Sequence, residues 1–182
     1  MKPAQAWFSR LTAKPTAATL GMMILAAGFL LSVPCVRADM NLSVTDTNFM
    51  LAAAQGGMTE VKLGEVAAQK GMREDVKAFG QLMVKDHTAI NDNLKALAAQ
   101  KGVTLPDSLD AEHQGMVDKL SALAGSAFDD AYIAAMTKGH KKDLKAFKAE
   151  AEATQDADLK SFLGKSIPIV AEHLKIITAM KK

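Results

Sequence analysis

Cysteine is almost absent from this sequence. The one cysteine among the 182 residues, Cys35, lies in an N-terminal apolar stretch. Without that stretch the chain has no disulfide, no thiolate nucleophile, no iron–sulfur ligand and no attachment site for c-type haem. Stability must then come from burial alone, and the remaining chain is long enough for one domain with a sizeable core.

Acidic residues are absent from the first 38 residues, which have the pattern of a signal peptide. Lys2, Arg10 and Lys14 come first, an apolar run follows over residues 17–33, and the segment ends in Val-Arg-Ala at Ala38. We therefore predict a signal peptide over residues 1–38, cleaved after Ala38, and a periplasmic domain over residues 39–182. The alternative is an uncleaved N-terminal membrane anchor, because the run is at the lower limit for a membrane span.

A strong charge of one sign is also absent from the predicted domain. The segment 1–38 holds four of the 22 basic residues and none of the 20 acidic ones, which leaves a formal net charge of −2. A nearly neutral domain lacks the excess of positive charge that is typical of proteins that bind nucleic acid. We expect no membrane span after residue 38, while a homo-oligomer and an unidentified protein partner stay open.

Strand signals are missing as well, so the fold class is predicted to be all-α. There is no alternating apolar run and no Asn-Gly hairpin, and good helix formers dominate. Breaks in the sequence predict four long helices over residues 46–70, 72–101, 126–154 and 156–182, with a short one over 108–123. Thr45 or Asp46, Ser126 and Asp156 are the expected N-caps, and Gly102 the expected C-terminal stop.

The lengths of the connections predict the topology. Each pair of long helices is joined by a few residues and must be antiparallel, while about 24 residues with the short helix join the two pairs. A helix of 16 residues covers about 24 Å, enough to return along most of a bundle. This favours a ferritin-like four-helix bundle with one long crossover that contains a short extra helix. A five-helix up-and-down bundle is the alternative.

Each long helix carries a polar residue on its apolar face. At about 100° per residue, these inward residues are Glu60, His87, His140 and His173. Counting along the predicted helices places them within about 10 Å of one level. Buried carboxylates and imidazoles pair with each other or bind a metal, so these four residues are candidate ligands of a divalent ion such as Fe, Zn, Mn or Cu.

Four further residues are candidates for the second shell of this site: Asp86, Asp129, Tyr132 and Asp143. They could act as additional ligands or accept the imidazole N–H groups. Met83 and Met136 each precede a histidine by four residues within matched Phe/Tyr-x3-Met-x-Lys-x-His patterns. A thioether beside an imidazole would suit copper(I) or a haem with mixed axial ligands, although methionine on an apolar face is ordinary core filling.

The sequence lacks the motifs of known catalytic sites that we looked for. No Ser-His-Asp or other nucleophile arrangement is visible, and the Glu-x-x-His pattern of di-iron bundles is missing because Val84, Thr137 and Val170 precede the three histidines by three residues. We therefore do not predict an enzyme. The fourth histidine, His113, is expected to face solvent.

Four stretches resemble the exported bacterial proteins of domain-of-unknown-function family 4142. They are FMLAAAQGGMTEVKLGEVAAQKG, VKAFGQLMVKDHTAINDNLKALAAQKGVTLP, FDDAYIAAMTKGHKKDLKAF and IPIVAEHLK. The resemblance covers about residues 48–180 and implies a ferritin-like fold, often labelled an outer-membrane or membrane protein, with no established activity. The family's Glu, Asp-His, Tyr and His positions correspond to Glu60, Asp86, His87, Tyr132, His140 and His173.

Two functional hypotheses remain open from the sequence. One is an exported bundle that binds a metal ion and has a redox or stress-protective role. The other is a non-catalytic structural or partner-binding envelope protein, in which the core histidines and Glu60 form only a polar network that fixes the helix register.

Overall fold

The computed structural model describes residues 42–180, which belong to one compact unit and contain five α-helices and no strand. This confirms the all-helical prediction. The helices are α1 (Val44–Lys70), α2 (Glu74–Lys101), α3 (Ala111–Ser121), α4 (Gly125–Ala153) and α5 (Ala157–Ala179). The predicted signal peptide, its cleavage site and the alternative anchor lie outside the described residues.

Most helix ends follow the expected capping chemistry. Ser43 caps α1, and the Asp46 carboxylate accepts a hydrogen bond from the Ser43 backbone N–H. The predicted caps Thr45 and Asp46 were therefore wrong by two to three residues. Asp156 caps α5 and Gly102 ends α2 at φ 70°, both as predicted. The predicted cap Ser126 was wrong, because α4 begins at Gly125 and its N-cap, Ala124, offers no side-chain acceptor.

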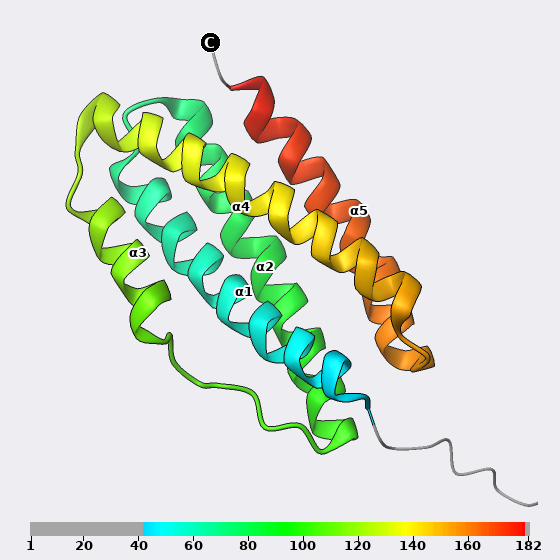
Figure 1. Ribbon diagram of the computed structural model, residues 1–182. Coiled ribbons are helices and arrows are strands. Elements are labelled where there is room, and N and C mark those ends of the chain that lie inside the picture. The colour runs from blue at the N-terminus through cyan, green and yellow to red at the C-terminus, as the bar shows by residue number, and fades with distance from the viewer. Residues whose placement is uncertain (1–41, 181–182) are drawn as a thin grey trace, which may run out of the picture. The chain divides into compact units, whose positions relative to one another are not determined.

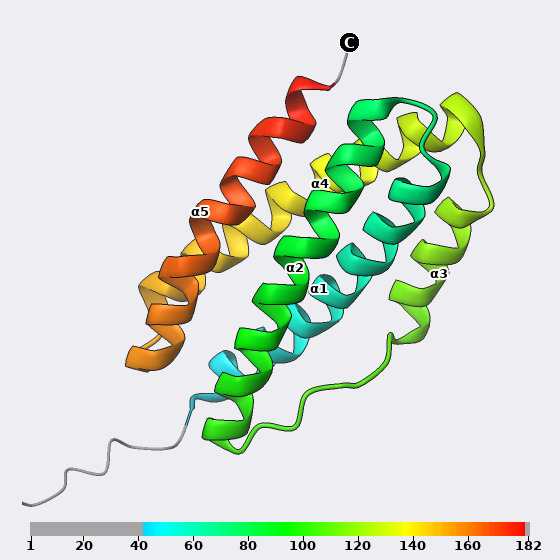
Figure 2. The same ribbon diagram turned by 180° about the vertical axis from the view of Figure 1, so that it is seen from behind.

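The helices form two antiparallel hairpins. Residues 71–73 join α1 to α2, and residues 154–156 join α4 to α5, while residues 102–124 with α3 connect the hairpins. Figures 1 and 2 show α1 and α2 side by side, with α3 along the outer side of α1 and α5 beside α4. Because α1 also contacts α4 and α2 contacts α5, the four long helices enclose a common interior.

Two glycines allow α1 and α2 to approach closely about two turns from the residues that join them. A Cβ atom added to Gly64 would lie 2.8 Å from the Gly80 carbonyl oxygen, and one added to Gly80 would lie 2.7 Å from the Gly64 carbonyl oxygen. Such contacts with backbone cannot be relieved by a side-chain movement. The close approach brings Glu60, one turn before Gly64, against the face of α2 that carries His87.

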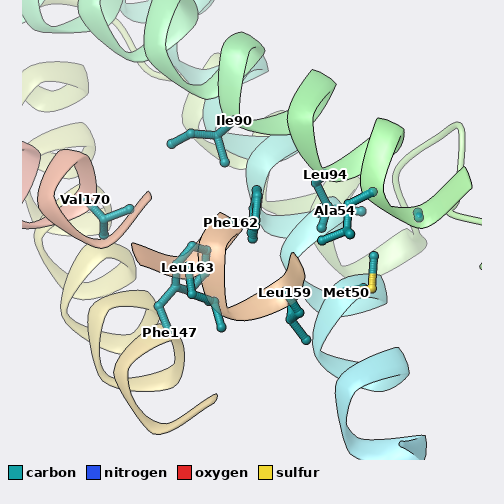
Figure 3. Packing of buried hydrophobic residues seen from close by; sticks show 11 residues of the cluster. Met50, Ala54, Ile90, Leu94, Phe147, Leu159, Phe162, Leu163 and Val170 are labelled. Carbon is teal, nitrogen blue, oxygen red and sulfur yellow. The ribbon is translucent and has the colours of Figure 1, made fainter. Parts of the chain in front are cut away.

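The interior contains two apolar clusters separated along the bundle. Figure 3 shows one, in which Met50, Leu94, Phe147 and Leu163 come from all four long helices. The other is built around Leu63, Phe79, Tyr132 and Ile177. On every long helix the inward polar residue lies between its contributions to the two clusters, so a polar layer divides the core.

None of the helices in residues 42–180 is long and apolar enough to cross a membrane.

Candidate metal centre

Three imidazole rings meet in the polar layer. His87, His140 and His173 are 3 %, 0 % and 1 % exposed, and one ring nitrogen from each lies within 4.8 Å of one from each of the others. Their ring centroids are 5.6 Å apart for His87 and His140, 5.2 Å for His87 and His173, and 5.5 Å for His140 and His173. Three helices thus contribute to one nearly equilateral cluster.

One nitrogen of each ring has a hydrogen-bond acceptor. His87 Nδ1 donates to Glu60 Oε2 over 2.8 Å, and His173 Nε2 donates to Asp86 Oδ2 over 3.0 Å. His140 Nδ1 donates to the Met136 carbonyl oxygen one turn earlier, over 3.0 Å, and lies 3.4 Å from Glu60 Oε1. These acceptors fix the orientation and tautomer of each ring, as the outer partners of metal-bound histidines do.

The other nitrogen of each ring is buried without a hydrogen-bond partner among the described residues. These atoms are Nε2 of His87, Nε2 of His140 and Nδ1 of His173. With the N–H groups directed at their acceptors, each free nitrogen of a neutral ring presents a lone pair. A buried polar atom without a partner costs roughly 1–3 kcal/mol, so three in one place require an explanation.

Glu60 provides the negative charge of the cluster and is 9 % exposed. Burial opposes its ionisation, but the charges and hydrogen bond of His87 and the other two rings outweigh burial and hold the Glu60 pKa below its ordinary value. Burial likewise opposes protonation of His87, yet Glu60 raises the His87 pKa above 6.5. For His140 and His173 burial prevails and lowers the pKa, so both favour the neutral form that binds metals.

The two matched sequence patterns lie opposite each other. Phe79 packs edge-on against Tyr132, with ring centroids 6.3 Å apart, while His87 faces His140. Phe79 also lies 6.4 Å from the His140 ring and 6.0 Å from the His173 ring. Met83 and Met136 are buried in the same apolar cluster as Phe79. This cluster closes one side of the polar layer.

The remaining candidates from the sequence occupy different places. Asp86 accepts from His173, and Asp143 lines a cleft together with Glu60 and His87. Burial and the charge of Glu60 raise the Asp143 pKa to about 7. The Tyr132 hydroxyl is buried with no hydrogen-bond partner among the described residues, and burial raises its pKa.

The carboxylate of Asp129 makes its hydrogen bonds away from the histidine cluster. Its two carboxylate oxygens accept from the backbone N–H groups of Met72 and Arg73, at 3.0 and 2.8 Å, at the start of α2. It lies eleven residues before His140 on α4, about 16 Å along the helix. His113 lies on α3, where its Nδ1 is 2.8 Å from Asp110 Oδ1, and its side chain is 28 % exposed.

Sequence reasoning missed two parts of the site. The Met136 carbonyl accepts the His140 N–H, and no side-chain pattern signals a backbone acceptor. Phe79 covers two of the histidines, and the periodicity marked it only as a core residue. Its matched spacing with Tyr132 was the one available signal, since both precede a histidine by eight residues.

A second buried polar cluster lies where α1 begins and α4 ends. Asp46 and Glu150 are 4 % and 6 % exposed, and Thr154 lies beside them. Burial, a hydrogen bond to Asp46 and the charge of Asp46 raise the Glu150 pKa to about 7. In this pair one carboxyl group lies against another, whereas in the histidine cluster the carboxylate of Glu60 lies against imidazoles.

Comparisons with known proteins identify a family but no activity. A search among curated proteins found no match. A crystal structure described as a DUF305 fragment from Deinococcus radiodurans is similar with a TM-score of 0.67 and 10 % identity, over 76 % of this chain and 95 % of that chain. At this identity the likeness shows a shared fold alone. The family described as Domain of unknown function (DUF4142) matches residues 32–180, and the chain therefore belongs to the DUF4142 family.

Proposed function

We propose that this protein is an exported, ferritin-like helical bundle that binds one divalent transition-metal ion through His87, His140 and His173. The observation that carries the proposal is the set of three free ring nitrogens in one buried cluster. A metal ion accepts all three lone pairs at once. Imidazole suits zinc, copper, iron and nickel, and three histidines with one open position are a common zinc arrangement.

The outer partners support the same assignment. Glu60, Asp86 and the Met136 carbonyl each hold the N–H of one histidine. In this assignment Glu60 is an outer partner, because its oxygens lie against the Nδ1 atoms of His87 and His140 and not at the free nitrogens. Its negative charge offsets part of the charge of the bound ion.

The geometry needs a small adjustment on binding. Zinc–nitrogen bonds of about 2.0–2.1 Å in a tetrahedral site separate the nitrogens by roughly 3.3 Å. One ring nitrogen of each histidine lies within 4.8 Å of one from each of the others, so the nitrogens that bind the ion must come closer by rotation of the rings. The proposed export and periplasmic location follow from the predicted signal peptide, and the ferritin-like arrangement is supported by the two hairpins and the long crossover.

A closed polar network is the competing explanation, and the free nitrogens argue against it. A network that only fixes helix register should satisfy its own donors and acceptors. It predicts that histidine substitutions lower thermal stability while a chelator has no effect.

Zinc stoichiometry tests the proposal. Purified protein freed of metal is dialysed against Zn(II) and the bound metal is measured by mass spectrometry, with the His173→Ala and His113→Ala variants in parallel. We expect one zinc ion per chain in the wild type and in His113→Ala, and none in His173→Ala. Substoichiometric zinc that is equal in all three proteins would overturn the proposal.

A further inference from the structure

A cleft of about 420 Å³ leads to the histidine cluster. It runs between α1, α2 and α4, and its lining includes the exposed residues Asp110 and Lys142 as well as the buried residues Glu60 and His87. His87 is 3 % exposed and carries one of the three free nitrogens. The cleft therefore reaches the proposed metal centre at His87 and its partner Glu60, while His140 and His173 do not line it.

The walls of the cleft are mostly apolar. Phe49 and Phe147 lie edge to face with ring centroids 5.2 Å apart, and Ile90, Leu94 and Val170 complete the wall. A cleft of this volume falls within the usual range of small-molecule sites, which combine apolar walls with a few polar groups. Structural zinc sites are closed, whereas sites with three protein ligands keep a position for water or another ligand.

The charged and titratable groups around the cleft are of both signs. Three carboxyl groups line it, from Glu60 and Asp143 near the histidines and Asp110 near the surface. Lys142 is the only lysine or arginine among the described lining residues. An anion would be repelled by the Asp110 and Glu60 carboxylates on this route, whereas a neutral molecule is repelled by groups of neither sign.

Gly56 keeps part of the cleft open. A Cβ atom added at Gly56 would meet no atom within 4 Å, whereas one at the neighbouring Gly57 would lie 2.0 Å from Asn91 Oδ1. A larger residue at position 56 would therefore extend into free space and not into the core. Helix propensity also favours it, because glycine is a poor helix former.

We propose that this cleft binds a small, uncharged, largely apolar molecule whose nitrogen or oxygen lone pair takes the open position on the ion held by His87, His140 and His173. The inference rests on the proposed metal-binding function. The apolar wall holds the body of the molecule, and the open coordination position fixes its donor atom.

Cobalt(II) reports on this site because its visible spectrum changes with its ligands. The protein loaded with Co(II) is titrated with imidazole, with 4-phenylimidazole as the apolar neutral probe, and with benzoate as the anionic probe. We expect 4-phenylimidazole to change the spectrum and to bind at least about tenfold tighter than imidazole, because its phenyl ring adds apolar burial. Benzoate should bind more weakly than both.

Filling the cleft should block the probe without removing the metal. Gly56→Leu should weaken 4-phenylimidazole binding at least about tenfold while Co(II) uptake stays unchanged. Gly164→Leu is the matched control, because a Cβ at this exposed α5 glycine also meets no atom within 4 Å. Ala146→Leu, on the α4 side of the cleft, gives a second blocked variant if Gly56→Leu folds poorly.

The outcomes separate the two proposals. If Co(II) binds but neither imidazole changes its spectrum, or if both blocked variants bind 4-phenylimidazole as tightly as the wild type, the cleft proposal is wrong and the metal function stands. If no Co(II) binds to the histidines, the metal function fails and the cleft proposal fails with it.

Discussion

Glu60 and Glu150 are both buried glutamates on core faces, yet their pKa values are shifted in opposite directions. Glu60 lies among three imidazoles, and its pKa is held below the ordinary value. Glu150 lies against Asp46, and its pKa is raised to about 7. Their exposed fractions are similar, at 9 % and 6 %. Burial is the largest influence on both groups and raises both pKa values, so the neighbouring groups decide the net direction of the shift.

The contrast extends to what each region can do. The Asp46–Glu150 cluster lies where α1 begins and α4 ends, and Glu150 Oε1 is its one buried side-chain atom without a hydrogen-bond partner among the described residues. The layer around Glu60 keeps its negative charge and has three free nitrogens beside it. Imidazole nitrogens suit a transition-metal ion, and so the two clusters are suited to compare a pair of carboxyl groups with a proposed binding site.

The largest expected effect is stabilisation by metal that depends on the histidines alone. At a zinc concentration 100 times the dissociation constant, binding adds about 2.7 kcal/mol to the unfolding free energy. For a domain of this size the melting temperature should rise by roughly 5–10 °C. Scanning calorimetry with zinc and with chelator should show this rise in the wild type and in Glu150→Gln, and none in His140→Ala. A rise of equal size in His140→Ala would contradict the assignment.

Glutamine substitutions at the two glutamates should change stability in opposite directions. Glu60→Gln keeps the shape but removes the charge that His87 needs, so at pH 6 it should cost on the order of 1–3 kcal/mol. Glu150→Gln removes a group whose raised pKa favours folding below pH 4.5 and whose benefit is lost as the pH rises through about 7. At pH 8 it should stabilise the protein by about 1 kcal/mol.

Denaturant unfolding of the metal-free proteins at pH 4, 6 and 8 measures both effects. The Glu60 contribution should be present above pH 4.5 and should fade as the pH falls through its lowered pKa. The contrast between the two glutamates would be contradicted if Glu150→Gln destabilised the protein at pH 8, or if Glu60→Gln left its stability unchanged at pH 6.

Zinc affinity should depend on the protonation of His87. Its folded pKa is raised above 6.5, so its ion pair with Glu60 stabilises the metal-free protein below pH 6.5 and is lost as the pH rises through that pKa. Zinc must displace this proton. Below the His87 pKa the apparent affinity should fall by roughly tenfold per pH unit, and above it the affinity should level off.

Calorimetric titrations with zinc across pH 5.5–8 check this dependence. In Glu60→Gln the decline should begin at a lower pH, because the largest interaction that raises the His87 pKa is then lost while burial still lowers it. Glu150→Gln should follow the wild type. A zinc affinity that does not change between pH 5.5 and pH 8 would exclude His87 as a ligand.

The smallest expected effect concerns Asp86. It accepts from His173, but its side chain is 23 % exposed, and an asparagine can still accept that hydrogen bond. Asp86→Asn should therefore weaken zinc binding by only about threefold to tenfold, at the low end of the range for outer partners. Asp92→Asn, an exposed change on the same helix, is the matched control. Equal affinities of the two variants would remove Asp86 from the site.

The fold was predictable because the residues that begin and end most of its helices act locally. Gly71, Gly102 and Asp156 mark helix ends by chemistry that does not depend on the rest of the molecule. The start of α4 was misplaced because Ala124 supplies no cap, and Ser126 resembled one. The Ser43 cap was missed because its partner at the third helical position is Asp46, where the usual signature has Glu or Gln.

The sequence predicted which residues form the site, but not which of their atoms are free to bind a ligand. Helical periodicity and helix length identified Glu60, His87, His140 and His173, since each interrupts an apolar face. Which nitrogen stays free depends on acceptors on other helices, such as Asp86 for His173, and on the backbone of Met136. The cleft arises from how α1, α2 and α4 pack, and no local pattern encodes it.

X-ray absorption spectroscopy of the zinc-loaded protein examines the metal environment most directly. Three imidazole nitrogens at about 2.0–2.1 Å and one further light ligand are expected, with the imidazole scattering lost in His140→Ala. A shell made only of carboxylate and water oxygens, or an unchanged spectrum in His140→Ala, would mean that the three histidines do not hold the ion.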